Sequence, residues 1–194
     1  MKIIVILLLT LFSTQCSRSY EKSYLDLESA FIDWYHKFHP VESSLLGYAG
    51  FDSFFPKLDK DSQDEYIADV NRFTIELSQI DVTKLDPSSR VDYKILYHKL
   101  ELMKYILNEQ KPWEWNPLWY INELFDGIYI LSESNNLLME EKVNGVLSRL
   151  KYIPLILETS QSTLVYFSPQ HVIYTKNKID LLIELLNELP IKLN

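Results

Sequence analysis

A helical pattern of apolar residues is clearest in residues 86–107, DPSSRVDYKILYHKLELMKYIL. Apolar side chains recur there at intervals of three and four residues, which is the spacing of one face of an α-helix. The residues of this face are Leu96, Leu100, Met103 and Leu107. Asp86 supplies a capping carboxylate and Pro87 suits the first helical turn, so we predict a long helix that begins here and ends before Pro112.

The same spacing recurs on both sides of this segment. It predicts further helices at about residues 27–38, 62–77, 118–131, 138–153 and 169–190. Ser62 followed by Glu65 is a capping-box pattern, which predicts a helix that begins at Ser62. Ser168 precedes a proline, so we expect it to cap the last helix, which should end at Pro190. Pro154 interrupts an apolar pattern, so the chain there either bends or begins a new helix.

The composition favours a helical fold as well. Only four glycines occur in 194 residues, and 47% of the residues are hydrophobic, which is enough for a buried core. Amphipathic helices of this kind bury their apolar faces against one another. We therefore predict an all-α fold, an irregular bundle of about six helices, as a single domain over residues 23–194 after an N-terminal signal segment.

The N-terminus has the organisation of an export signal. Lys2 precedes an apolar run over residues 3–12, and a short polar stretch leads to Cys16, the only cysteine. This order resembles a bacterial lipoprotein signal over residues 1–15, with Cys16 as the lipidated residue and residues 16–22 as a tether. Ser13 and Gln15 differ from the usual residues before the cysteine. The alternative is an ordinary signal peptide that is cleaved nearby and leaves Cys16 lost or as a free thiol.

These features restrict the location and partners of the protein. The apolar run is shorter than the roughly 20 residues that a membrane span needs, so we expect a lipid anchor that holds the chain on a membrane, at its periplasmic or outer surface. The formal net charge is −8, with no run of lysine and arginine, which argues against nucleic acid as a partner. A single cysteine cannot form a disulfide within the chain, so packing alone must stabilise the fold.

Three common sequence patterns of catalytic sites are missing from this chain. It contains no glycine-rich phosphate loop, no Gly-x-Ser-x-Gly motif and no His-Glu-x-x-His motif. His36 and His39 have a spacing at which two imidazoles could reach one cation, but two histidines are too few, and histidine near a helix end is commonly a capping residue. We therefore predict no catalytic residue, no metal ligand and no cofactor.

The most unusual segment is rich in large aromatic residues. Its members are Trp113, Trp115, Asn116, Trp119 and Tyr120. Such rings could stack against a sugar or a peptide, because they offer broad apolar faces with a polar edge. They could equally fill a junction between helices, with Asn116 capping the helix that Pro117 opens. We favour burial, since large aromatic residues belong to protein cores more often than to ligand sites.

Four segments carry a family resemblance. Residues 40–47, 85–96, 115–120 and 148–154 resemble, in order and spacing, motifs of the bacterial family named domain of unknown function 885. The similarity extends over about residues 25–190. Members of that family are longer, are often exported or lipid-anchored, and look like helical zinc carboxypeptidases. Their zinc ligands lie in a C-terminal half that has no counterpart here, so the resemblance implies zinc only for full-length relatives.

The resemblance leaves two hypotheses for function. In the first, the chain is the N-terminal helical portion of a peptidase-like exported lipoprotein and is inactive alone, because its catalytic C-terminal half is missing. Apolar side chains should then be exposed where that half packs. The candidates are Leu181, Leu182, Leu185 and Leu186. In the second, the chain is a self-sufficient helical lipoprotein that acts as a binding or assembly module at the cell envelope.

Overall fold

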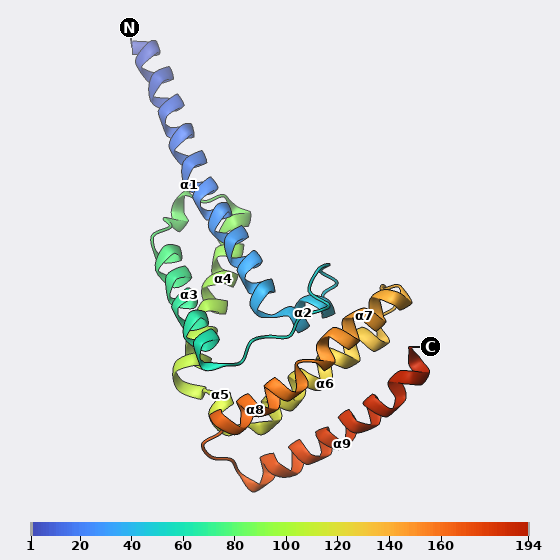
Figure 1. The fold of residues 1–194 in the computed structure, drawn as a ribbon. Coiled ribbons are helices and arrows are strands. Elements are labelled where there is room, and N and C mark those ends of the chain that lie inside the picture. Colours follow the sequence, from blue (N-terminus) through green and yellow to red (C-terminus); the bar gives the residue numbers. More distant parts are fainter. Residues whose placement is uncertain (1, 194) are drawn as a thin grey trace. The chain divides into compact units, whose positions relative to one another are not determined.

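The computed structural model confirms the all-α prediction. It describes residues 2–193, with side chains from residue 20 onward, and this range contains helices and no strand (Figure 1). The contacts divide the chain into two compact units, one formed by residues 2–34 and 64–109 and the other by residues 35–63 and 110–193.

The first unit is built from three long helices. They are α1 (Lys2–Phe38), α3 (Lys60–Ser78) and α4 (Pro87–Tyr105), with a short 3-10 helix, η1 (Val82–Lys84), before α4 and a π-helical turn, η2 (Ile106–Gln110), after it. One apolar side of each long helix is buried. These core residues include Tyr24, Leu27, Phe31, Trp34, Val70, Phe73, Leu77, Leu96, Leu100, Met103 and Leu107. The apolar face predicted for residues 86–107 is therefore the buried face of α4 and η2.

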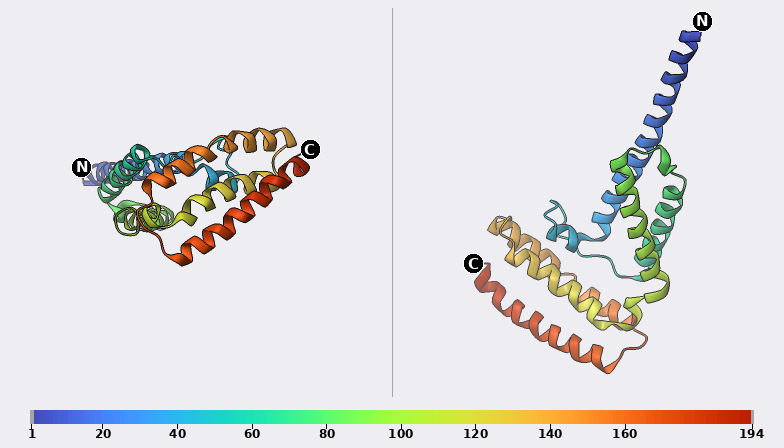
Figure 2. Two further views of the ribbon diagram at one scale, coloured as in Figure 1. Left: turned by 60° about the horizontal axis from the view of Figure 1, so that its bottom comes forward. Right: turned by 180° about the vertical axis from the view of Figure 1, so that it is seen from behind.

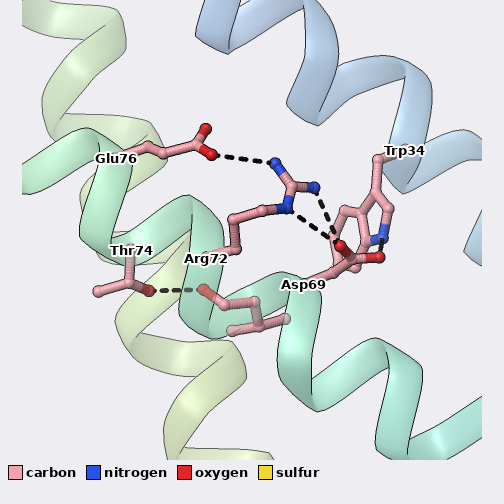
Figure 3. A network of polar contacts seen from close by, with 6 residues as sticks. Trp34, Asp69, Arg72, Thr74 and Glu76 are labelled. Carbon is pink, nitrogen blue, oxygen red and sulfur yellow. Dashed lines mark hydrogen bonds and ion pairs between the residues drawn. The ribbon is translucent and has the colours of Figure 1, made fainter.

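Aromatic rings and one polar network join α1 to α3. The ring of Phe73 lies 5.4 Å from Phe31 and 5.2 Å from Trp34, measured between ring centroids. The indole nitrogen of Trp34 donates a hydrogen bond of 2.7 Å to Asp69, which also binds Arg72 (Figure 3). The tryptophan thus contributes both apolar area and a satisfied polar edge to this unit.

The helix starts of this region include one confirmed prediction and one error. The Asp86 carboxylate accepts hydrogen bonds from the backbone of Ser88 and Ser89, as expected for a cap. The predicted start at Ser62 is wrong, because α3 begins at Lys60 and the capping carboxylate belongs to Asp59. Asp59 accepts from both the backbone and the hydroxyl of Ser62, so Ser62 is a partner of the cap.

The second unit surrounds a central helix. Helix α6 (Pro117–Glu133) packs against α2 (Pro40–Leu45), α5 (Pro112–Trp115), α7 (Met139–Leu150), α8 (Ile153–Thr163) and α9 (Pro169–Lys192). It lies between α9 and the α7–α8 pair (Figure 2). Because neighbours cover it on several sides, its buried residues are spread widely around its axis. They are Tyr120, Ile121, Leu124, Gly127, Ile128, Leu131 and Ser132.

Prolines lie in the first turn of α2, α5, α6, α8 and α9, whereas α7 begins without one. A new helix, α8, begins at Ile153, beside Pro154, which is the restart that the sequence allowed. Ser168 caps α9 by accepting a hydrogen bond of 3.3 Å from the backbone of His171. The predicted end at Pro190 is wrong, because α9 continues to Lys192. A proline in the last turn removes only one backbone donor, which a helix end tolerates better than a helix centre.

Helix α9 also corrects the prediction of an exposed leucine cluster. Leu182 and Leu185 are buried on the helix that packs against α6, and Leu186 is half-buried. Leu181, by contrast, is 50% exposed. The neighbouring leucines have different environments because successive residues of a helix point in directions about 100° apart.

The export-signal prediction concerns the start of the chain. The signal segment and Cys16 lie outside the residues whose side chains are described, and the backbone there belongs to α1. Among the described residues, none of the helices combines the length and the apolar content needed to cross a bilayer. Lipidation of Cys16 therefore stays a prediction.

Candidate functional site

The aromatic segment predicted as a possible ligand patch lies where α5 meets α6. Lys111 has a left-handed backbone with φ of 42°, and Pro112 then opens the short helix α5. Asn116 separates α5 from α6, and its side chain accepts a hydrogen bond of 3.2 Å from the backbone of Leu118. Asn116 thus has the capping role expected from its position before Pro117.

Two of the aromatic residues are buried. Tyr120 is fully buried, and its hydroxyl lies 3.0 Å from the carbonyl of Trp113 and 2.9 Å from the hydroxyl of Thr163 on α8. Trp113 is 9% exposed. Burial raises the pKa of Tyr120 above its ordinary value, because a phenolate would lose its hydration there. These two residues therefore join α5, α6 and α8 through packing and hydrogen bonds.

The other two tryptophans lie at the edge of the segment. Trp119 makes edge contacts with Trp113 and Tyr120, at centroid distances of 6.4 and 4.8 Å, and is half-buried. Trp115 is also half-buried, and its indole nitrogen donates a 2.6 Å hydrogen bond to the carbonyl of Gln110. Its ring lies 5.0 Å from the ring of His171 at the start of α9.

The structure thus brings all five predicted residues of the patch together, but it gives most of them internal partners. Asn116 and Tyr120 use their side-chain oxygens within the fold, and the Trp115 indole nitrogen is bonded to Gln110. The exposed parts of Trp115 and Trp119 could offer a stacking surface. A ligand for this surface remains a prediction.

A second site, for which the sequence predicted no functional role, surrounds Arg149 of α7. Arg149 is fully buried, and its guanidinium donates to several oxygens of the second unit. The acceptors are the carbonyls of Phe54 at 3.0 Å, Gly127 at 2.5 Å, Pro40 at 3.3 Å and Phe51 at 3.3 Å, and the hydroxyl of Ser44 at 2.7 Å. One side chain therefore holds α2, α6, α7 and the loop over residues 46–59 together.

The packing beside Arg149 leaves no room for a side chain at position 127. A methyl group added at Gly127 would lie 2.2 Å from the ring of Phe55, closer than atoms can approach. The absence of a side chain at Gly127 lets the Phe55 ring pack against α6, beside the carbonyl that accepts from Arg149. The guanidinium carbon in turn lies 5.5 Å from the centroid of the same ring.

Burial also changes the acid-base properties of this region. Loss of hydration lowers the pKa of Arg149 to about 10, and the negative charges of Asp52 and Glu123 oppose that change. Burial raises the pKa of Glu123 to about 7, and the charge of Asp126 adds to the increase, whereas Arg149 lowers it. Glu123 can therefore gain or lose a proton close to neutral pH, while Arg149 remains charged.

Arg149 can stabilise the packing of the second unit, and Glu123 can exchange a proton near neutral pH. The Arg149 guanidinium already donates to five oxygens, so its donors serve the fold. The sequence contains a signal for the burial of Arg149. The residues three and four positions before and after it, which would share its helix face, are uncharged: Gly145, Val146, Tyr152 and Ile153. An arginine on the apolar face of a helix is usually bonded within the protein.

The two neighbouring histidines have separate partners. His36 is buried, with its Nδ1 2.8 Å from the hydroxyl of Ser43 and its ring 3.8 Å from the ring of Tyr48. His39 stacks on Tyr35 at a centroid distance of 4.1 Å. Among the residues with described side chains, no three or more His, Cys, Asp or Glu form a group that could hold a metal ion.

Comparison with known proteins adds a relationship in fold. No family model matches the sequence, and no curated protein matches it. The structure is similar to that of a candidate lipoprotein of unknown function from Shewanella oneidensis, with a TM-score of 0.67 and 18% sequence identity over 88% of this chain. This chain spans 37% of the length of that protein's chain.

At this level of identity the likeness concerns the fold alone. It indicates that this arrangement of helices also occurs within a longer chain. The resemblance to domain of unknown function 885 stays a prediction from the four sequence segments.

Proposed function

We propose that this chain is the helical part of a peptidase-like, exported lipoprotein, held on a membrane by acylated Cys16. In this proposal it forms a wall beside a separate catalytic half, which supplies the zinc ligands and the general base. The chain itself supplies the wall and the attachment to the membrane. Hydrolysis by this chain alone is not expected, because nothing predicted in it would polarise a carbonyl or activate a water molecule.

The exposed apolar residues of α9 are the observation on which this proposal depends most. Leu182, Leu185 and Leu189 of this helix are buried, yet other apolar residues of the same helix are strongly exposed. Their exposed fractions are 37% for Ile179, 50% for Leu181, 51% for Ile183 and 83% for Ile191. Ile179 and Ile183, one helical turn apart, form an exposed apolar strip beside the buried stripe, whereas exposed Lys176, Asp180 and Glu184 lie on the side opposite it. The apolar surface of α9 is therefore wider than its buried stripe, which indicates a second partner.

The fold comparison supports the same proposal from another direction. The similar protein from Shewanella oneidensis is described as a candidate lipoprotein, and this chain corresponds to 37% of its length. An arrangement of helices that forms one part of a longer chain in one protein can serve as a part of a larger assembly in another.

The anchor is tested by growth of expressing bacteria with radiolabelled palmitate. We expect label in the protein and recovery of the protein in the membrane fraction. The Cys16→Ser variant should take up no label and should leave the membrane fraction after the leader is removed. Equal labelling of both proteins, or a mature protein that lacks Cys16, would refute the anchor.

The claim that this chain is inactive without a catalytic half is tested by a peptidase assay on the purified chain with added zinc. We expect no hydrolysis beyond the buffer rate, because the proposal assigns zinc ligation to another half. Chelator-sensitive cleavage of a peptide by this chain alone would overturn the proposal. The assay should use protein whose helical circular dichroism and cooperative unfolding have been verified, so that a negative result is informative.

A second function has its own support. The second unit has a central helix covered by five others and a buried arginine that joins four segments, as in a domain that folds without help. A self-sufficient binding or assembly module at the envelope would have these features. It predicts that the Cys16→Ser chain is a monomer at high concentration, and that Ile183→Ser leaves its behaviour unchanged.

A further inference from the structure

The connection between α8 and α9 exposes an unusual number of large apolar side chains. It includes the loop after Thr163 and the first turns of α9, and we refer to it as the α8–α9 corner. Its exposed apolar residues are Val165 at 75%, Tyr166 at 64%, Phe167 at 57%, Ile173 at 59% and Tyr174 at 61%. Clusters of exposed apolar residues on a folded protein commonly mark an interaction surface.

The backbone of the α8–α9 corner is held in place while these side chains face outward. The amides of Val165 and Tyr166 donate to the carbonyl of Glu114, at 2.7 and 3.4 Å. The side chain of Ser168 accepts from the backbone of His171 and closes the first turn of α9. The exposure of Tyr166 and Phe167 thus belongs to a loop with defined backbone hydrogen bonds.

The sequence segment of this corner differs in charge from the rest of the chain, although Glu114 and Asp126 of other helices lie beside it. The whole sequence contains 27 aspartate and glutamate residues among 194, but residues 159–179 contain none. Lys176 in this stretch is exposed, and Lys178 lies 3.5 Å from Asp126. The N-terminal end of α9 adds a partial positive charge, with no acidic residue in its first turn.

We propose that the α8–α9 corner binds the surface of an anionic phospholipid bilayer. Tyrosine and phenylalanine side chains are well suited to the boundary between lipid headgroups and acyl chains. A lysine and a positive helix end beside them match the negative charge of such a surface. A membrane is a better partner for this surface than a protein, because residues 159–179 contain no acidic residue although the chain as a whole is acidic.

This contact is separate from the anchor at Cys16. Cys16 belongs to the first unit and the α8–α9 corner to the second, so binding at the corner would orient the second unit on a membrane independently of the anchor. The contact does not depend on acylation, so it can be measured in a chain that carries no lipid. Failure of this test would leave the proposed anchor and the proposed peptidase-like role intact.

The experiment uses a fluorophore placed at one of two positions. Because Cys16 is the only cysteine, Cys16→Ser gives a cysteine-free chain in which one new cysteine can be labelled with nitrobenzoxadiazole. Gln170→Cys places the label in the first turn of α9, within the corner. Asn135→Cys is the matched control, because it is exposed in the connection between α6 and α7 of the same unit.

Vesicles of phosphatidylethanolamine and phosphatidylglycerol are then added, with phosphatidylcholine vesicles as the uncharged comparison. We expect a blue shift and a rise of about twofold in emission from the label at residue 170 with anionic vesicles, reduced by salt. The label at residue 135 should not respond. The double change of Tyr166→Ser and Phe167→Ser should abolish the response at residue 170, and Lys176→Glu should weaken it, with circular dichroism unchanged.

Several results would overturn the proposal. One is an equal response of the labels at residues 135 and 170, which would indicate adsorption through the leader or the whole surface. Another is the absence of any response of the label at residue 170. A response that depends on protein concentration and not on vesicles would show instead that the corner binds a second copy of the chain. Retention of the full response after the double change would also exclude the α8–α9 corner.

Discussion

Arg72 in the first unit and Arg149 in the second are surrounded in opposite ways. Arg72 is on the surface of α3, with 46% of its side chain exposed, and it bonds to Asp69 at 3.0 Å and Glu76 at 3.3 Å (Figure 3). Arg149 is fully buried, and the oxygens that accept from it are neutral. The carboxylates of Asp52 and Glu123 act on Arg149 only through the electrostatic field.

The difference shows that the number of ion pairs is a poor guide to what an arginine contributes. Water competes with Asp69 and Glu76 for Arg72, so these pairs are worth little. Water cannot replace Arg149, because the carbonyls that it satisfies would be left buried without a donor. We therefore expect the stability of the second unit to depend on Arg149, and that of the first unit to depend mainly on its apolar core.

The largest expected effect comes from Arg149→Met. This change keeps an apolar side chain of similar length but removes the donors to Phe54, Gly127 and Ser44, so we expect a loss of about 3 to 5 kcal/mol in the free energy of unfolding. Urea denaturation followed by circular dichroism measures it. A loss below about 1 kcal/mol would show that the buried network is not what stabilises the second unit.

An intermediate effect is expected from Glu123 as the pH changes. Its pKa in the folded chain is raised to about 7, above the ordinary value of 4.5, so the folded state binds the proton more tightly than the unfolded state. Stability from this group is therefore greatest below pH 4.5 and falls as the pH rises toward 7, by about 1 to 3 kcal/mol.

The matched variant for this prediction is Glu123→Gln, which cannot ionise. Its free energy of unfolding should lack the decrease between pH 5 and pH 7, apart from changes due to other groups that both proteins share. Urea denaturation of the two proteins at several pH values gives the comparison. Parallel pH profiles would mean that Glu123 has an ordinary pKa and is not under the influence of burial near Arg149.

The smallest effect is expected from Arg72→Met, which serves as the surface counterpart of Arg149→Met. Loss of its pairs with Asp69 and Glu76 should cost between 0 and about 1 kcal/mol, and less at high salt. Trp34 keeps its hydrogen bond to Asp69, so tryptophan fluorescence should change little. A loss as large as that of Arg149→Met would remove the distinction between the two arginines.

The helices of this protein were largely predictable because their signals are local. Asp86 and Ser168 cap their helices through contacts within three residues, and Asn116 caps α6 in the same way. The apolar face of residues 86–107 follows from the helical repeat alone. The start of α3 was predicted wrongly because Asp59 and Ser62 are both good capping residues, and a sequence does not rank two such neighbours.

Contacts between distant segments were harder to predict. The burial of Leu182 and Leu185 beside exposed Leu181 depends on which side of α9 meets α6. The partners of Arg149 come from segments as far away in sequence as Pro40, 109 residues before it. The five residues of the aromatic segment were found by composition, but whether they are buried or exposed was set by Thr163 and His171 on other helices.

The sequence by itself determined that the chain is helical, where most helices begin and end, and that its first residues have the form of a lipoprotein signal. These properties depend on contacts within a few residues, so they can be derived from spacing and capping. Only the tertiary structure decided that Arg149 is buried, that Glu123 titrates near pH 7, and that apolar residues at the α8–α9 corner are exposed. Burial and electrostatic fields arise from segments far apart in the chain, and their approach is known only once the helices have packed.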